Sequence, residues 1–180
     1  LFSALNSNQR TDFSRYNYFH ASYAISIGKI NEAKSIVQSA LKLYPRNLLL
    51  NQYKIDLNEL KNIDAFDCRK EKHVAAEILY ITANALSSQS LYSLSNFYLN
   101  LAKFLNEDFH SFETLLAENF YKTNNFEDAK KIYKNLSKRG EAFKWYSTKQ
   151  LARIFIQEKK TKDAIKLTSS VYKDLINKEV

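Results

Sequence analysis

Residues 21–45 read ASYAISIGKINEAKSIVQSALKLYP, and this stretch decides the expected fold. Its apolar residues recur every three or four positions, which is the spacing of one face of a helix. Gly28 interrupts the pattern, and Pro45 ends it because proline cannot continue a helix. The stretch therefore predicts two helices joined by a tight turn. Ala21 and Ala33, twelve positions apart, stand where these two helices would cross.

A pair of small residues twelve positions apart returns three more times along the chain. The further pairs are Ala83 with Ser95, Ala117 with Ala129, and Ala152 with Ala164. The four pairs begin 62, 34 and 35 residues apart, and a recurrence near 34 residues is typical of two-helix repeats. Small residues allow two helices to approach closely. Because one such pair cannot bury its apolar face alone, stacking on neighbouring pairs is expected.

These repeats predict an all-α fold, an α-solenoid of stacked antiparallel helix pairs that forms a single domain over residues 1–180. Clear units are expected at about 14–45, 76–107, 110–141 and 145–176, with a degenerate unit at about 48–73. Aromatic residues that follow the helical packing spacing are expected in the core, among them Phe97, Phe104, Phe112 and Tyr133.

The composition excludes several classes of protein. The chain of 180 residues contains two glycines and one proline, too few for the turns of an all-β fold or for a glycine-rich phosphate loop. Its single cysteine, Cys68, excludes an internal disulfide framework. The sequence has no run of 18 apolar residues, so no membrane span is expected. Because methionine is absent and the sequence opens in a helix-like pattern, we expect a piece of a longer protein.

No catalytic, metal or cofactor site is predicted. His20, His73 and His110 lie far apart in the sequence and belong to no metal-binding motif. Glu77 and Glu118 are 41 residues apart, so a pair of carboxylates for acid–base catalysis is not indicated. The sequence therefore predicts a protein that is not an enzyme and that needs no cofactor.

The first and third units resemble the tetratricopeptide repeat (TPR). The first carries Ala21, Gly28, Ala33, Ala40 and Pro45 at the family's positions, and the third carries Ala117, Asn124, Ala129 and Tyr133. The resemblance covers about residues 14–172 and implies a right-handed solenoid that binds a peptide or partner protein in its concave groove. Residues 73–86, HVAAEILYITANAL, are also similar to TPR proteins of alphaproteobacterial cell envelopes. That similarity favours the periplasm or cell envelope over the cytoplasm as the location.

The resemblance also implies a set of partner-binding residues. In TPR proteins the first helix of each unit lines the groove, and residues three or four positions apart on that helix form one stripe. The implied stripe consists of Arg15, Tyr18, Ser22 and Ser26; Glu77, Tyr80, Asn84 and Ser88; Thr114, Glu118, Tyr121 and Lys122; and Tyr146, Lys149, Arg153 and Gln157. Lys122, Lys149 and Arg153 place positive charge at one end of this stripe, which favours an acidic partner.

The distribution of charge leaves a second function open. The chain has 27 Lys and Arg against 19 Asp and Glu, and residues 120–180 hold 15 against 7, which accounts for the whole net charge of +8. Pentatricopeptide repeats have a similar length and bind single-stranded RNA, so an RNA-binding repeat protein is the alternative. Cations such as Lys131 and Lys166 fall on second helices and not on the groove stripe. A protein partner is therefore preferred, nucleic acid is disfavoured, and the oligomeric state is left open.

Overall fold

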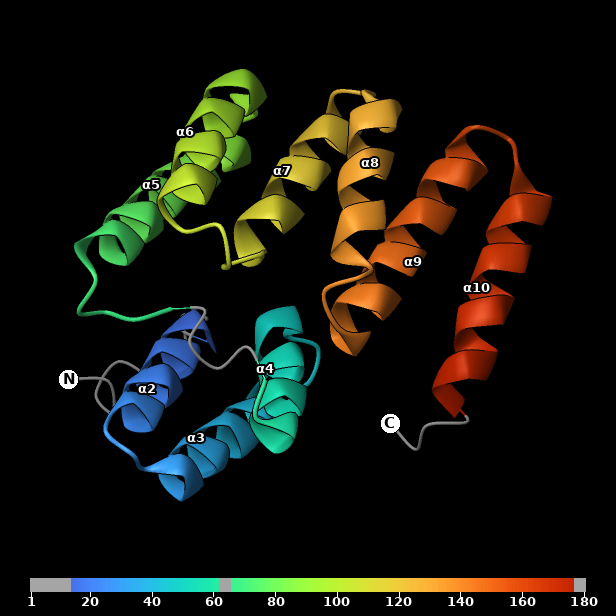
Figure 1. Cartoon of the computed structure of the whole chain (residues 1–180). Helices are drawn as coiled ribbons and strands as arrows, with labels where there is room; N and C mark the ends of the chain where they lie inside the picture. Colours follow the sequence, from blue (N-terminus) through green and yellow to red (C-terminus); the bar gives the residue numbers. More distant parts are fainter. Residues whose placement is uncertain (1–13, 62–65, 177–180) are drawn as a thin grey trace. The chain divides into compact units, whose positions relative to one another are not determined.

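The computed structural model describes residues 14–61 and 66–176 (Figure 1). In these two ranges the chain forms nine α-helices and no strand, which confirms the all-α prediction. The helices are α2 (Ser14–Ser26), α3 (Ile30–Leu43), α4 (Leu48–Glu59), α5 (Glu71–Ser88), α6 (Tyr92–Leu105), α7 (Ser111–Lys122), α8 (Phe126–Leu136), α9 (Glu141–Gln157) and α10 (Thr161–Ile176). None of the helices described combines the length and the apolar character that a membrane crossing requires.

The chain divides into two compact units, and the division passes through α5 and α6. Unit 1 comprises residues 1–79 and 101–109, so it holds α2, α3, α4, the first part of α5 and the last part of α6. Unit 2 comprises residues 80–100 and 110–180 and holds the remainder of these two helices with α7 to α10. The stacking of all helix pairs into one solenoid over residues 1–180 stays a prediction.

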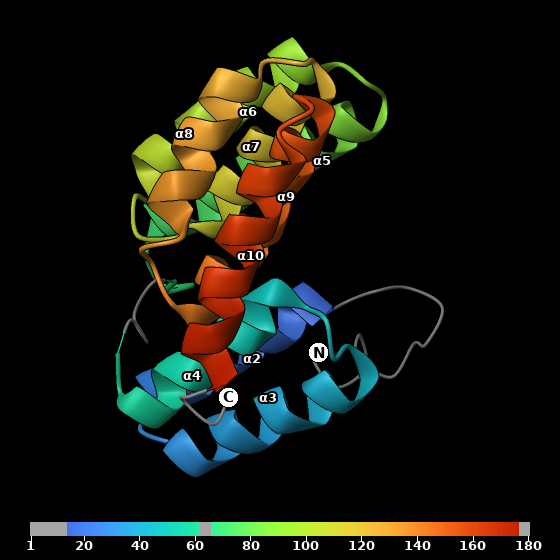
Figure 2. The ribbon, with the colours of Figure 1, turned by 90° about the vertical axis from the view of Figure 1, so that its right-hand side faces the viewer.

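The small residues that define the repeat are buried on consecutive helices. Ala21, Ala33, Ala83, Ser95, Ala117 and Ala129 are 0% exposed, and Ala152 and Ala164 are 7% and 4% exposed. The helices that carry three of these pairs, α2 and α3, α7 and α8, and α9 and α10, pack against each other. In the fourth pair the Ser95 hydroxyl on α6 donates to the Ala83 carbonyl oxygen on α5 at 2.8 Å. Figures 1 and 2 show each of these pairs as neighbouring antiparallel helices.

All four helix pairs close with the same turn. Seven positions after the first small residue, Gly28, Ser90, Asn124 and Lys159 adopt left-handed backbone, with φ of 79°, 64°, 60° and 62°. The amide of the following residue donates to the carbonyl five positions earlier in each turn, for example from Lys160 to Phe155 at 2.8 Å. This is the Schellman arrangement, which pairs carbonyl groups that a helix end otherwise leaves without a partner. The repeat seen in the sequence is therefore also a repeat of local structure.

Unit 1 has an aromatic core, to which the predicted degenerate unit contributes α4. The ring of Tyr18 on α2 lies 4.5 Å from that of Tyr53 on α4 and 5.3 Å from that of Phe109. The Asn47 side chain caps α4 by accepting from the Leu50 amide at 3.0 Å. Between α4 and α5, the described residues 60–61 and 66–70 contain no helix, and the rest of the predicted connection, residues 62–65, lies outside the described residues.

In unit 2, a buried polar network joins α7 to α5 and α6. Asn119 on α7 is 0% exposed, and its amide nitrogen donates to Ser95 Oγ and to Asn96 Oδ1, both at 2.8 Å. Its amide oxygen accepts from Ser87 Oγ at 2.6 Å. These bonds tie α7 to both α5 and α6. Since every hydrogen-bonding group of the Asn119 amide has a partner, its burial costs little.

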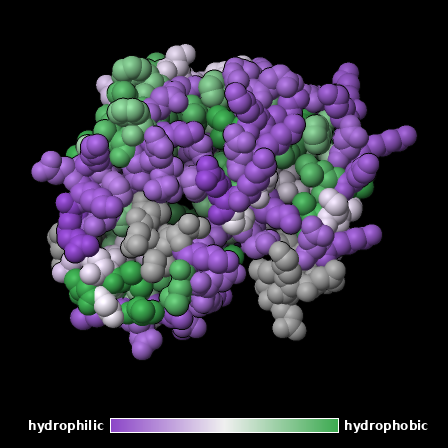
Figure 3. Space-filling view, viewed as in Figure 1, coloured by the Kyte–Doolittle hydropathy of each residue, from purple (hydrophilic) through white to green (hydrophobic). Residues whose placement is uncertain are grey.

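The expected burial of the aromatic residues on α6 is wrong for two of them. Phe112 and Tyr133 are 1% and 0% exposed, but Phe97 and Phe104 are 57% and 77% exposed. Figure 3 shows hydrophobic residues gathered at the surface over α5 and α6. The buried face of α6 is formed by Ser95 and its neighbours one and two turns later, and Phe97 and Phe104 lie on the opposite side of the same helix.

Candidate partner-binding site

Four of the predicted groove residues come together in unit 2, namely Glu118, Tyr121, Tyr146 and Arg153. The Arg153 guanidinium, on α9, lies 3.8 Å from the centre of the Tyr121 ring on α7. Its Nη1 atom lies 3.4 Å from both carboxylate oxygens of Glu118 and 3.2 Å from the Gln150 side-chain oxygen. We call Glu118, Tyr121, Tyr133, Tyr146, Gln150 and Arg153 the Arg153 cluster. Burial tends to lower the pKa of Arg153, but the charge of Glu118 and the contact with Tyr121 raise it, so the cation is firmly retained.

Two tyrosines extend the Arg153 cluster toward the core. The Tyr133 hydroxyl, on α8, donates to Glu118 Oε2 at 3.4 Å, and the rings of Tyr133 and Tyr146 lie 6.1 Å apart in an edge-to-face contact. Burial, together with the charge of Glu118, raises the pKa of Tyr146 to about 12. Burial raises the pKa of Tyr133 as well. Both phenols therefore stay protonated at neutral pH and keep their ability to donate a hydrogen bond.

Three further predicted residues lie next to the Arg153 cluster in the sequence: Lys122 follows Tyr121, and Lys149 and Gln157 lie four positions before and after Arg153. Lys122, in the last turn of α7, and Lys149 and Gln157, on α9, are all exposed. The Lys149 ammonium lies 5.8 Å from the Trp145 ring, a weak cation–π contact. Neither lysine forms an ion pair with any residue of the described part of the chain. Their charges are therefore available to a partner in solution, whereas Arg153 is partly neutralised by Glu118.

The remaining predicted residues of unit 2 play smaller roles. The Tyr80 ring on α5 lies 5.5 Å from Phe112 on α7, so it packs at a helix junction. Thr114 is half-buried, and its hydroxyl donates to the Ser111 carbonyl of its own helix at 2.7 Å. Asn84 and Ser88 are exposed on α5, and the Ser88 hydroxyl donates to the Ala85 carbonyl at 2.7 Å.

In unit 1 the predicted groove residues bond to or pack against other residues of the same unit. Arg15 and Glu77 form a two-bond ion pair, Nε to Oε1 at 2.5 Å and Nη2 to Oε2 at 2.6 Å, and Glu77 is buried. Tyr18 is 2% exposed in the aromatic core. The buried Ser22 hydroxyl donates to the Tyr53 hydroxyl at 3.2 Å. These residues stabilise unit 1, and we therefore omit Arg15, Tyr18, Ser22 and Glu77 from the proposed site. Ser26 is half-buried and donates to the Tyr23 carbonyl at 2.8 Å.

Sequence reasoning missed Gln150 and the polar role of Tyr133. Gln150 precedes Arg153 by one helical turn, so its contact with the guanidinium follows from helix geometry once Arg153 is placed. Tyr133 was expected only as a packing residue, and its ring is indeed fully buried. The link from its hydroxyl to Glu118 joins residues of two helices. No spacing rule within one helix indicates such a bond.

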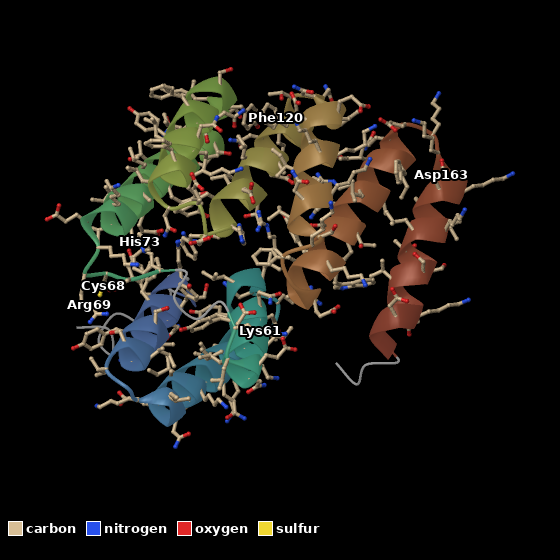
Figure 4. The ribbon with its side chains drawn as sticks, viewed as in Figure 1. Lys61, Cys68, Arg69, His73, Phe120 and Asp163 are labelled. Carbon is tan, nitrogen blue, oxygen red and sulfur yellow. The ribbon has the colours of Figure 1, made fainter. Side chains whose placement is uncertain are left out.

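Outside the Arg153 cluster, polar residues near the start of α5 form hydrogen bonds with one another. In Figure 4, Cys68, Arg69 and His73 lie close to the start of α5. Asp67 accepts from Arg69 at 2.9–3.1 Å, which lowers the pKa of the Asp67 carboxyl to about 2. The Asp67 amide donates to His73 Nδ1 at 3.0 Å.

Over residues 14–61 and 66–176, no three His, Cys, Asp or Glu side chains are grouped so that they could hold a metal ion. A shallow depression at the turn from α2 to α3 is lined by Gly28, Lys29, Ile30, Asn31 and Glu32 and contains none of the predicted site residues.

The described residues thus define an all-α protein with repeated helix pairs and a surface cluster of aromatic and charged side chains. Comparison with known proteins adds no relative, since no protein-family model and no curated protein matches the sequence.

Proposed function

We propose that this protein is a non-catalytic interaction module of the tetratricopeptide type, in which the helix pairs stack as a right-handed solenoid and bind an acidic segment of a partner protein. The single observation that carries the proposal is the Arg153 cluster, in which residues from α7, α8 and α9 come together and the Arg153 side chain stays 43% exposed. The similarity of residues 73–86 to TPR proteins of alphaproteobacterial cell envelopes favours the periplasm or cell envelope over the cytoplasm as the location.

The repeat of turns and crossings supports the stacking part of the proposal. Four helix pairs share buried small residues at the crossing and a left-handed residue at the turn. Within unit 2, α7 contacts α8 and α8 contacts α9, so consecutive pairs are in contact there. Repeats that contact only their neighbours are the general plan of solenoid proteins.

The charges favour an acidic partner. Lys122 and Lys149 are exposed. The Arg153 guanidinium lies 3.8 Å from the centre of the Tyr121 ring, its Nη1 lies 3.4 Å from Glu118, and 43% of the Arg153 side chain is exposed to solvent. A guanidinium held on an aromatic ring loses little conformational entropy when it binds a carboxylate. Tyr121 and Tyr146 provide flat, half-exposed surfaces for apolar atoms of the same segment.

The experiment measures binding of a labelled ten-residue peptide of alternating glutamate and leucine to the full chain by fluorescence anisotropy. We expect Lys122→Glu with Lys149→Glu to weaken binding by about ten-fold or more, because two attractive contacts become repulsive. The matched control, Lys131→Glu with Lys134→Glu, makes the same charge change at exposed positions of α8 and should alter Kd by less than about three-fold. Equal losses in both variants, or equal binding of a glutamine–leucine peptide, would show that the cluster is not the binding site.

A further inference from the structure

One side of α6 exposes a row of four large apolar residues, which we call the α6 stripe. Leu94, Phe97, Leu101 and Phe104 are 47%, 57%, 38% and 77% exposed. They follow one another at intervals of three, four and three positions, the spacing by which two helices contact each other along their length. All four lie on one continuous helix, so their alignment follows from the geometry of α6 alone. Figure 3 shows hydrophobic surface in this part of the molecule.

The corresponding positions of the other second helices are polar. The small crossing residue sets the register of these helices, and it is Ser95 on α6 and Ala33, Ala129 and Ala164 on α3, α8 and α10. Every counterpart of the α6 stripe in this register is polar and exposed. The counterparts are Glu32, Ser35, Ser39 and Lys42 in α3, Asp128, Lys131, Asn135 and Lys138 in and just after α8, and Asp163, Lys166, Ser170 and Lys173 in α10. A contiguous apolar row at positions that are polar elsewhere in the chain is typical of an interaction surface.

The α6 stripe also lies almost entirely in a segment without charge. Residues 78–102 contain no Asp, Glu, Lys or Arg, although the chain has a net charge of +8. The first charged residue after this segment is Lys103, which is exposed. Two copies of a cationic chain repel each other, and the repulsion is weakest where neither surface carries a charge. The α6 stripe is therefore a surface on which a second copy can be accommodated.

The order of leucine and phenylalanine fits a second copy as well. In an antiparallel arrangement centred at position 99, Leu94 meets Phe104 of the other copy and Phe97 meets Leu101 of the other copy. Each large ring is thus opposite a smaller side chain, and the contacts are the same in both directions, as a two-fold interface requires. The two Lys103 residues lie about 12 Å apart along the helix axis in this arrangement. A parallel arrangement would bring the two lysines side by side and each phenylalanine against itself.

From these observations we propose that the α6 stripe is a homodimer interface, in which α6 packs antiparallel against α6 of a second copy across a two-fold axis. The interface shares no residue with the Arg153 cluster, so the dimer carries two copies of that cluster. It is built from one short helix on each side, and a dissociation constant weaker than about 1 µM is expected for so small a contact.

The test is sedimentation velocity of the full chain at concentrations from about 10 to 300 µM, a range suited to a small interface. We expect a monomer–dimer equilibrium whose dissociation constant rises about ten-fold or more in Leu94→Glu, because a carboxylate would be buried against Phe104 of the other copy. Leu43→Glu is the matched control, the same change at a 62% exposed position of α3, and should leave the dissociation constant within about three-fold. Circular dichroism checks that both variants keep the helical content of the unchanged chain.

A second charge tests the antiparallel register. Phe104→Lys added to Leu94→Glu should lower the dissociation constant of the single variant by about ten-fold, because each ammonium then meets a carboxylate of the other copy. Positions 94 and 104 lie about 15 Å apart along α6, so the two charges cannot pair within one copy. Leu101→Lys added to Leu94→Glu gives the same net charge at a position that faces Phe97, and it should restore nothing.

Several outcomes would overturn this assignment. A chain that remains monomeric at the highest concentration would exclude the second copy. A dimer weakened equally by Leu94→Glu and Leu43→Glu would have its interface elsewhere, and equal recovery by Phe104→Lys and Leu101→Lys would exclude the antiparallel register. A monomer that binds vesicles of uncharged phosphatidylcholine, and loses this binding in Leu94→Glu, would assign the α6 stripe to a lipid surface.

Discussion

At the scale of single residues, the left-handed turn positions show most clearly what the sequence could predict. The sequence predicts breaks between the paired helices at Gly28, Ser87–Ser90, Thr123–Asn125 and Lys159–Lys162, and each break contains a left-handed residue. Only the first is glycine, for which this backbone conformation is unstrained. For Lys159 the same conformation costs roughly 1 kcal/mol, because its Cβ approaches a carbonyl oxygen. The periodic pattern predicts the position of the turn, but not that a lysine would adopt it.

This cost yields a matched pair of substitutions. Lys159→Gly should raise the free energy of unfolding by about 1 kcal/mol, because glycine adopts φ of 62° without strain. Lys166→Gly removes the same side chain from an exposed position inside α10 and should lower stability by about 1 kcal/mol. Urea unfolding followed by circular dichroism measures both. If the two substitutions changed stability in the same direction, the turn geometry assigned to Lys159 would be incorrect.

The candidate site was also predictable only in part at this scale. Spacing within α7 and α9 places four residues on one stripe, and the structure brings these four together: Glu118, Tyr121, Tyr146 and Arg153. The Arg15–Glu77 ion pair joins residues 62 positions apart and buries a predicted groove residue. A helical period identifies the face on which a residue lies. It does not identify which distant segment covers that face.

At the scale of helices, the crossings depend on small side chains. Ala117 and Ala129 are fully buried where α7 packs on α8, and their equivalents in the other pairs are buried as well. Burial at these positions was predictable because the twelve-residue spacing is local to one helix pair. The exposure of Phe97 was not predictable, because α6 carries apolar residues on two faces and the sequence does not say which one is covered.

We expect Ala117→Leu or Ala129→Leu to lower the free energy of unfolding by about 1–3 kcal/mol, because three added carbon atoms must separate two helices in contact. Ala85→Leu is the matched control at an exposed position of α5 and should change stability by less than about 0.5 kcal/mol. Thermal unfolding by circular dichroism gives the comparison. Equal melting temperatures for Ala117→Leu and Ala85→Leu would contradict the assigned crossing.

At the scale of the whole molecule, the net charge of +8 has to be reconciled with the proposed protein partner. Lys131 and Lys134 on α8 and Lys162 and Lys166 on α10 are exposed. All four lie outside the Arg153 cluster, on the second helices of their pairs. A single-stranded RNA, the alternative partner that the sequence left open, would therefore have to bind these cations and not the Arg153 cluster.

For single-stranded RNA we expect a Kd weaker than about 1 µM at about 150 mM salt, as measured by anisotropy with a labelled 20-nucleotide polyuridine. The residual affinity should fall in Lys131→Glu with Lys134→Glu more than in Lys122→Glu with Lys149→Glu. Submicromolar binding that is lost in the second variant would instead assign the Arg153 cluster to RNA and displace the proposed protein partner.

The buried amide of Asn119 has a consequence for how the chain finds its native arrangement. Its counterpart 35 positions later is Ile154, which is also 0% exposed. At this position one junction of unit 2 has an amide that makes three directional bonds, and the next junction has an apolar side chain. If α9 took the position of α7, the hydroxyls of Ser87 and Ser95 would lose their amide partner. If α7 took the position of α9, the Asn119 amide would be buried where α9 has the apolar Ile154, which is unfavourable. In a chain of similar helix pairs, Asn119 therefore distinguishes one junction from the next and disfavours assembly of the helices in the wrong order.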